Sequence, residues 1–348
     1  MFGSTPVASI TTADIARFRA QLLAPHTEHS HVTRGLPRQG KNRSGSKSPR
    51  LVTRSPKTVK HIVGTLKRIL DTALDDRAIE SNPVVSGRRH TTKRANGGHR
   101  EPFKHRPLTS SQVAALYDWI ARERNNSVYA LAVLFTAYTG VRAAELQGLQ
   151  AGDVTLSDIP GTVGSVRIER TMKKSRAAAD APLVWTEGTP KSDASTNRVV
   201  PLAPWLADDL RQYLATIHPF AGKHPHAPLF PGKRTRAGKA TAAVEDFDWA
   251  KPIVVDNLYH NYLQPACKAL RLGAVRFHDL RHTFATLALS AGEHYMQVSK
   301  WLGHSSYVLT LSTYADYIRE DDTAAPAFDR PVASATSNVV PMEQRRSG

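Results

Sequence analysis

Residues 278–317, HDLRHTFATLALSAGEHYMQVSKWLGHSSYVLTLSTYADY, carry most of the chemistry that the sequence offers. His278 and Arg281 lie three residues apart, so a helix or helical turn places them on one face. WLGH ends a predicted helix at Gly303 and presents His304 at a turn, and Tyr314 follows in the polar STYADY. Arginine holds two phosphate oxygens at once, and histidine donates a hydrogen bond or shuttles a proton. The stretch predicts helices whose polar groups surround a phosphodiester, although an isolated HxxR is more often a capping or surface pair.

A second motif, TGVRAAEL at residues 139–146, places Arg142 at the start of a predicted helix, directly after a glycine turn. Helix N-termini attract anions, so Arg142 is a candidate second arginine of a phosphate clamp. Glu145 lies one turn further on and is a candidate to orient Arg142. The alternative for this pair is an exposed helical ion pair that contributes little to stability.

Two arginines, two histidines and a tyrosine suggest nucleophilic phosphoryl transfer, in which a phenolate attacks phosphorus and becomes covalently attached. An unperturbed tyrosine has a pKa of about 10, so the arginines must stabilise the phenolate and the charge of the transition state. Lys191, in TPKSDASTNRVVPL between two predicted strands, is the candidate general acid for the leaving oxygen. No acidic cluster resembles a magnesium site, so we expect neither a metal nor another cofactor.

The formal net charge of +17 lies mostly at one end of the chain. Residues 1–106 hold 21 Lys and Arg against 7 Asp and Glu, a charge of +14 that leaves +3 for residues 107–348. This asymmetry favours a polyanionic partner, chiefly nucleic acid, over basic loops that are merely solvated.

Cysteine content and hydropathy exclude several classes of protein. Cys267 is the single cysteine, which excludes an intramolecular disulfide framework and multi-cysteine metal sites. No run of about 18 apolar residues occurs, and the first residues lack the pattern of a signal peptide. We therefore expect no membrane partner and a cytoplasmic protein, associated with the nucleoid when bound to DNA.

The N-terminal part is predicted to hold two helices, at residues 11–24 and 55–79. A basic, Gly/Ser/Pro-rich loop without fixed structure is expected between them at residues 25–54, and Asn82-Pro83 is expected to stop the second helix. One face of that helix has an apolar stripe that includes Ile69 and Leu74. The other face presents the candidate DNA contacts Lys57, Lys60, Lys67 and Arg68.

A second domain is predicted to begin at Leu108, because Thr109 and Gln112 match a capping box. A buried helix follows and ends at Gly140. Strand-like runs at residues 165–171, 182–185 and 197–202 predict one small antiparallel sheet, whereas residues 219–252 have the composition of loops. Helices resume at residue 257, so the fold class is mainly α with a small antiparallel β-sheet.

Six positions resemble, in order and spacing, the motif of the tyrosine recombinase (phage integrase) family, and the resemblance covers residues 107–320. They are Arg142, Lys191, His278, Arg281, His304 and Tyr314. The resemblance implies that the two arginines clamp the scissile phosphate, that the lysine protonates the leaving 5′ oxygen, and that the histidines donate or shuttle protons. It further implies that Tyr314 attacks phosphorus, since it follows a Thr-rich stretch and precedes an alanine.

Other side chains near the motif have weaker assignments. Tyr295, Tyr307 and Tyr317 are rivals for the nucleophile. Glu145 and Asp279 are candidates to orient the groups that touch the phosphate.

The resemblance also implies a domain organisation. Residues 1–86 would form a reduced helical core-binding domain with the basic loop at 25–54, and residues 87–106 a basic linker. Residues 107–324 would form the catalytic domain, and residues 325–348 a disordered tail. The two domains would close around DNA as a C-shaped clamp.

The implied reaction joins two double-stranded DNA recombination sites through a 3′-phosphotyrosyl intermediate and a Holliday junction. It takes place in a homotetramer on DNA, formed from subunits that are monomers when free. Accessory DNA-bending or directionality proteins are candidate partners. Because the protein link conserves the energy of the broken bond, neither ATP nor a metal is implied.

Two alternatives stay open from the sequence. A tyrosine-class topoisomerase would share this active site and relax supercoils without a partner site. A non-catalytic DNA-binding protein would bind DNA without forming a covalent adduct. Paired-site products separate the first alternative from a recombinase, and a covalent adduct excludes the second.

Overall fold

The computed structural model describes residues 5–28, 50–84, 106–175, 182, 184–190, 195–234 and 247–318. The chain divides into two units, Met1–Arg100 and Glu101–Gly348. Lys191, the expected tail at 325–348 and all of the expected linker except Arg106 lie outside the described residues. The four-part division of the chain expected from the sequence therefore stays a prediction.

The described part of the first unit holds two helices and a pair of short strands. Helix α1 (Thr12–Leu23) begins with a threonine cap, because the Thr11 hydroxyl accepts from the backbone N–H of Asp14, and the Asp14 carboxylate accepts from the backbone N–H of Thr11. Helix α2 (Pro56–Asp75) is capped by Ser55, with Pro56 at its first position. The 3₁₀ turn η1 (Val7–Ser9) precedes α1.

The prediction that residues 25–54 lack fixed structure is wrong at both ends of that segment. Strand β1 (His26–Glu28) pairs antiparallel with β2 (Arg50–Val52). Residues 29–49, which join these strands, lie outside the described residues. Backbone pairing gives residues 26–28 and 50–52 an order that their composition does not indicate.

Helix α2 also differs from its prediction at its C-terminal end. It stops at Asp75, well before Asn82-Pro83, and Arg77 follows with a left-handed φ of 60°. Asn82 instead folds back and donates from Nδ2 to the carbonyl of Lys67 and to Asp71. Ile69 is 59% exposed and Leu74 is also exposed, so the buried face of α2 is narrower than the predicted apolar stripe.

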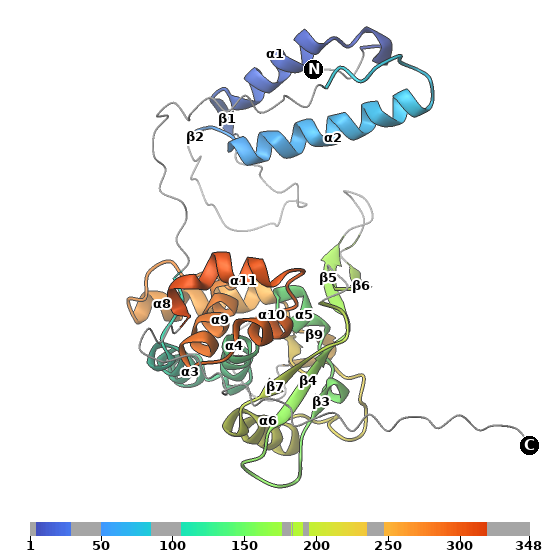
Figure 1. Ribbon diagram of the computed structural model, residues 1–348. Helices are drawn as coiled ribbons and strands as arrows, with labels where there is room; N and C mark the ends of the chain where they lie inside the picture. The colour runs from blue at the N-terminus through green and yellow to red at the C-terminus, as the bar shows by residue number, and fades with distance from the viewer. Residues whose placement is uncertain are drawn as a thin grey trace, which may run out of the picture. The chain divides into compact units, whose positions relative to one another are not determined.

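The second unit is mainly helical, which confirms the predicted fold class. Its helices are α3 (Ser110–Glu123), α4 (Ser127–Thr139), α5 (Ala143–Gly148), α6 (Pro204–Thr216), α7 (Val255–Leu258), α8 (Gln264–Ala269), α9 (Asp279–Ser290), α10 (Tyr295–Leu302) and α11 (Tyr307–Tyr314). Shorter turns are η2 (Ala151–Asp153), the π-helical η5 (Tyr259–Leu263) and η6 (Ala315–Tyr317). Figure 1 shows α3, α4 and α8–α11 gathered together, with β3, β4, β7 and α6 beside them. Among the described residues, no helix is both long and apolar enough to cross a membrane.

Helix α4 is the centre of this unit. Nearly all of its residues are buried, and it packs against both α3 and α9. The predicted capping box at Thr109 and Gln112 starts α3, which fixes where the helical core begins. Gly140 ends α4 in the left-handed region, with φ 66°, and so turns the chain directly into α5.

The strands form three antiparallel sheets in the described part of this unit, where the sequence predicted one. Strands β3 (Val154–Thr155), β4 (Gly164–Ile168) and β7 (Arg198–Leu202) make a sheet in the order β3-β4-β7. The run at 182–185 belongs instead to a hairpin of β5 (Thr171–Ser175) and β6 (Val184–Gly188). Residues 219–252, predicted as loops, contain the hairpin of β8 (Pro231–Lys233) and β9 (Phe247–Pro252). Here pairing between distant strands overrides local composition.

We predict that Gly140→Ala destabilises the second unit by about 2–5 kcal/mol. A left-handed alanine costs about 1–2 kcal/mol, and crowding adds about 1–3 kcal/mol. The crowding arises because a Cβ at residue 140 would lie 2.6 Å from the Phe284 ring and 2.9 Å from Leu302. Urea titration measures the change.

Gly222→Ala is the matched control, because Gly222 has φ +71° and no atom within 4 Å of an added Cβ. It should cost only the backbone part, about 1–2 kcal/mol. Equal losses in the two variants would contradict the packing argument.

Candidate active site

A buried carboxylate in the first turn of α5 links two arginines, one at the start of that helix and one on β7. Glu145 is 1% exposed and accepts from both Nη atoms of Arg198 at 2.9 and 2.7 Å. Its Oε1 also accepts from Arg142 Nη1 at 2.8 Å, and its Oε2 accepts from the Arg142 backbone N–H at 2.7 Å. Burial by itself would raise the pKa of Glu145, but hydrogen bonds and charges from Arg198 and Arg142 lower it to about 2. The predicted role of Glu145 in orienting Arg142 agrees with this geometry, and the pair is not the exposed ion pair of the alternative.

The C-terminal end of α10 collects three arginines. The backbone carbonyls of residues 301–303 accept, in order, from Arg198 Nε at 2.8 Å, from Arg281 Nη2, and from Arg142 Nη2 at 3.2 Å. Terminal carbonyls of a helix lack partners within the helix and carry its negative dipole end, so cations are stabilised there. Side chains from α5, β7 and α9 are thereby brought to one point.

This cluster holds more positive than negative charge. Arg281 is 3% exposed and also donates to the Gly140 carbonyl at 2.6 Å. Burial lowers the pKa of Arg281 to about 9, with the charge of Arg142 adding to the effect, so Arg281 stays protonated at neutral pH. Arg142 and Arg198 contact the Glu145 carboxylate, and Arg281 meets the same helix end, which leaves two positive charges in excess among these four groups. An excess of positive charge in partly desolvated surroundings favours a bound anion.

His304 lies at the same helix end, just beyond the left-handed Gly303, as predicted. Its Nδ1 forms a 2.8 Å hydrogen bond with the buried Thr310 hydroxyl, which fixes the orientation of the ring. Burial, with the charges of Arg281 and Arg142, lowers the pKa of His304 to about 4. The imidazole is therefore neutral at neutral pH and can still donate one proton from one ring nitrogen.

His278 stands at the N-cap position of α9 with part of its surface exposed. Partial burial and the charges of Arg281 and Arg276 lower its pKa below the ordinary value. Asp279 is fully buried and accepts from the backbone N–H and the guanidinium of Arg276 at 2.8 Å. This carboxylate fastens the start of α9, which carries both His278 and Arg281.

Tyr314 ends α11 and is buried, at 3% exposure. Its hydroxyl lies 2.5 Å from Nδ1 of His282. Burial raises the pKa of Tyr314 to about 12, although the charge of Arg281 works in the opposite direction. Its rivals Tyr307 and Tyr317 are 48% and 38% exposed. Tyr314 therefore lies within the electrostatic reach of the arginine cluster.

Five of the six predicted catalytic residues thus lie on elements that meet at the end of α10, and Lys191 lies outside the described residues. Sequence reasoning missed Arg198, Ser195, His282 and Thr310. Arg198 did leave a signal, because alternation along β7 puts it on the buried face with Val200 and Leu202. A buried arginine there demands a carboxylate partner.

Ser195 and His282 had no comparable local signal. The Ser195 hydroxyl accepts from Arg142 Nη1 at 3.1 Å and donates to the Gly303 carbonyl at 2.7 Å. His282 contacts Tyr314, which lies 32 positions further along the sequence.

The four candidate DNA contacts all lie on α2, in the first unit. Lys57, Lys60 and Arg68 line a groove of about 460 Å³ together with His61 and Gly64. Lys67 differs from them because its ammonium pairs with Asp71 at 2.8 Å. Three of the four cations therefore face one open groove.

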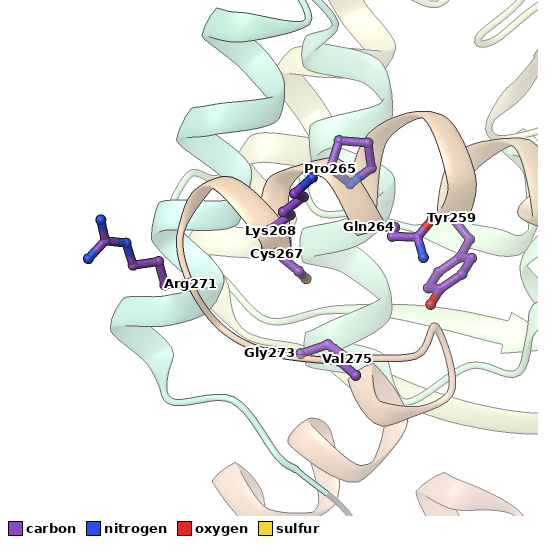
Figure 2. A pocket seen from close by; sticks show the side chains of 9 residues that line it. Tyr259, Gln264, Pro265, Cys267, Lys268, Arg271, Gly273 and Val275 are labelled. Carbon is purple, nitrogen blue, oxygen red and sulfur yellow. The ribbon is translucent and has the colours of Figure 1, made fainter.

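A larger cavity, of about 890 Å³, lies elsewhere in the second unit, along α8 and the segment after it. Figure 2 shows Lys268, Cys267 and Gln264 on the helix that borders it, with Gly273 and Val275 on the opposite side. None of its described lining residues belongs to the predicted catalytic set. The arginine cluster, and not this cavity, is therefore the candidate active site.

Comparisons with known proteins point to one family. The chain matches the model of the phage integrase family over residues 106–320. It is 27% identical over 284 residues to the putative prophage phiRv2 integrase of Mycobacterium tuberculosis, covering 82% of this chain and 63% of that protein. It is 25% identical over 266 residues to the ICEBs1 integrase of Bacillus subtilis, covering 75% of this chain and 61% of that protein. The chain spans less than two thirds of the length of each of these relatives.

The fold is similar to that of the Tn1549 transposon integrase, solved in complex with a circular intermediate DNA and with transposon right end DNA. The TM-score is 0.55 at 18% identity, over 90% of this chain and 83% of the other. This likeness supports the mainly helical fold with small antiparallel sheets.

We predict that Glu145→Gln lowers the free energy of unfolding by about 3–5 kcal/mol at pH 7, because it removes one charge of a buried pair and leaves two arginines without their carboxylate. The pKa of Glu145 is about 2 in the folded protein, below its ordinary 4.5. The carboxylate therefore stabilises the fold fully above pH 4.5, and this contribution is lost as the pH falls towards 2. In urea titrations between pH 7 and pH 2.5, the free energies of unfolding of wild-type protein and Glu145→Gln should converge as the pH falls.

Glu169→Gln provides the control, because Glu169 pairs with Arg167 and Arg170 at a partly exposed site. That change should cost less than about 1 kcal/mol. A loss for Glu145→Gln that stays constant down to pH 2.5 would contradict the assignment.

Proposed function

Because the chain belongs to the phage integrase family, we propose that it is a site-specific DNA recombinase. In this proposal it cleaves and rejoins DNA through a 3′-phosphotyrosyl intermediate and a Holliday junction. The observation that carries the proposal is the cluster of three arginines at the end of α10, two of them paired with Glu145, with a buried tyrosine nearby. Excess positive charge next to a nucleophile is what attack on a phosphodiester requires.

The arginines bind the scissile phosphate in this mechanism. The Arg142 side chain is 28% exposed, so an arriving phosphate meets it first. Arg281 is buried beneath and raises the local positive potential. Their backbone anchors at residues 140, 302 and 303 hold both side chains in place before DNA arrives, so little reorganisation is needed at the transition state.

Proton transfer is divided among the remaining groups. Tyr314 attacks phosphorus, and the leaving 5′ oxygen takes a proton from Lys191. His278 and His304 donate hydrogen bonds to phosphate oxygens or shuttle protons. The lowered pKa of His304 supports this role, since a neutral imidazole can donate without adding another charge to the cluster. Glu145 and Asp279 hold Arg142 and the start of α9 in position.

The proposal extends to partners and assembly. The DNA partners are double-stranded recombination sites, joined within a homotetramer whose subunits are monomeric when free, and accessory DNA-bending or directionality proteins assist. The reaction needs no metal or ATP, and it takes place on DNA in the cytoplasm. The domain boundaries at residues 86, 106 and 324 belong to the same proposal.

We expect that DNA with candidate recombination sites, nicked opposite the cleavage position and mixed with the protein in EDTA, becomes covalently attached. DNA from the genomic neighbourhood of the gene is the substrate, and denaturing gels detect the adduct. Tyr314→Phe should abolish the adduct because it removes the nucleophile, whereas Tyr317→Phe should keep it.

Each other outcome points to a different function. Relaxation of supercoils without paired-site products would indicate a topoisomerase. Firm DNA binding with no adduct would indicate a non-catalytic DNA-binding protein. An adduct that needs Mg²⁺ would overturn the metal-free mechanism.

We further predict that DNA affinity depends less on salt when the α2 groove loses charge. Each of Lys57→Ala, Lys60→Ala and Arg68→Ala should reduce the slope of log K against log salt by about 0.9, as expected for one phosphate contact. Lys67→Ala is the control and should change the slope less, because Lys67 is already paired with Asp71. Fluorescence anisotropy across salt concentrations measures the slopes, and equal effects at all four positions would count against a phosphate-binding groove.

A further inference from the structure

The hydroxyl of Tyr314 is not left to solvent but is held by a histidine. His282 follows Arg281 on α9, and its Nδ1 lies 2.5 Å from Tyr314 Oη. The two side chains are only 6% and 3% exposed. With its proton on Nε2, the imidazole of His282 accepts the proton of the Tyr314 hydroxyl at Nδ1 in this short hydrogen bond, inside the protein.

The surroundings of this pair suit a transferred proton. The ring of His278 lies edge-on to that of His282, with centroids 5.1 Å apart, and Arg281 and Asp279 are the charged neighbours of Tyr314. Burial raises the pKa of Asp279, but the hydrogen bonds and charge of Arg276, followed by the charge of His282, bring it below its ordinary value. A positive charge on His282 is therefore balanced by the Asp279 carboxylate, and the phenolate left behind is stabilised by Arg281.

We propose that His282 is the general base that removes the proton of Tyr314 during DNA cleavage, an inference that rests on the proposed recombinase function. The Tyr314 proton passes to His282 Nδ1, and an electron pair of the phenolate oxygen forms the new O–P bond. The bond from phosphorus to the 5′ oxygen breaks, and its electron pair leaves on that oxygen, which takes a proton from Lys191. In the rejoining step the same proton returns from His282 to Tyr314.

Neither of the other two histidines is placed to do this. His304 Nδ1 is hydrogen-bonded to Thr310, and the ring of His278 contacts the ring of His282. A base is needed because a tyrosine with a pKa of about 12 is ionised in only about one molecule in 10⁵ at pH 7.

The decisive experiment compares wild-type protein with His282→Asn and His282→Gln in single-turnover adduct formation. The substrate is the nicked genomic duplex described above. Asparagine offers an amide oxygen near the position of Nδ1, so it can accept the tyrosine hydrogen bond but cannot take up the proton. We expect the adduct to form on the order of 10²-fold to 10⁴-fold more slowly, with unchanged DNA affinity and thermal unfolding.

A bridging sulfur in place of the 5′ oxygen separates the base from the acid. Thiols have a pKa of about 8.5, so the leaving sulfur needs no general acid. This substrate should restore cleavage by Lys191→Ala and leave His282→Asn slow. A more acidic fluorinated tyrosine at position 314 lowers the need for a base. It should therefore restore cleavage by His282→Asn and leave Lys191→Ala slow.

The pH dependence gives a further test. Cleavage by His282→Asn should rise about tenfold per pH unit from pH 7 to pH 9, because hydroxide then generates the phenolate, while the wild-type rate should rise less steeply because His282 takes up the proton. His278, Asp279, Arg281 and Lys191 are present in both proteins, so the difference reports on His282.

The outcomes separate the two proposals. If wild-type protein forms no adduct although it binds the DNA, the recombinase function itself fails. If wild-type protein forms the adduct and both folded His282 variants form it as fast or faster, only the role of His282 is overturned. Should both variants fail to fold, the fluorinated tyrosine in otherwise wild-type protein decides. An unchanged pH profile supports the base, because His282 and not hydroxide takes the proton, and a profile that shifts to lower pH with the lower pKa of the fluorinated tyrosine refutes it.

Discussion

The candidate site depends on one buried carboxylate. Glu145 holds Arg142 and Arg198 through four hydrogen bonds, and so ties α5 to β7. A buried carboxylate with this many charged partners repays its desolvation only while all of them are present. Both arginines then reach the last carbonyls of α10, which brings the end of that helix to the same point. The ion pairs of Glu145 therefore set both where the arginine side chains lie and how much positive charge the site holds.

The arrangement also explains why the site is poised for an anion before one is bound. Arg281 adds a third positive charge, and the backbone carbonyls that it contacts are dipoles and supply no full negative charge. The nearby histidine His304 is kept neutral and Tyr314 is kept protonated by burial. An incoming phosphodiester would balance the excess charge, which gives the proposed binding of DNA an electrostatic cause.

The fold itself was only partly predictable. Caps were predicted well because they depend on residues three or four positions apart, as at Thr109 and Gln112 or at Gly140. The strands were predicted less well, because pairing partners lie far apart in the chain. The β8–β9 hairpin and the pairing of β1 with β2 lie in segments whose polar, Gly- and Pro-rich composition indicates loops.

The sequence by itself determined the identities and order of the groups proposed to bind phosphate, the charge asymmetry of the chain and the predominance of helices, because these depend on residue chemistry and local periodicity. Only the tertiary structure decided which of these groups touch. Glu145 meets Arg198 across 53 positions, and Tyr314 meets His282 across 32. Such contacts arise when packed helices and strands bring distant residues together, and no local pattern records that packing.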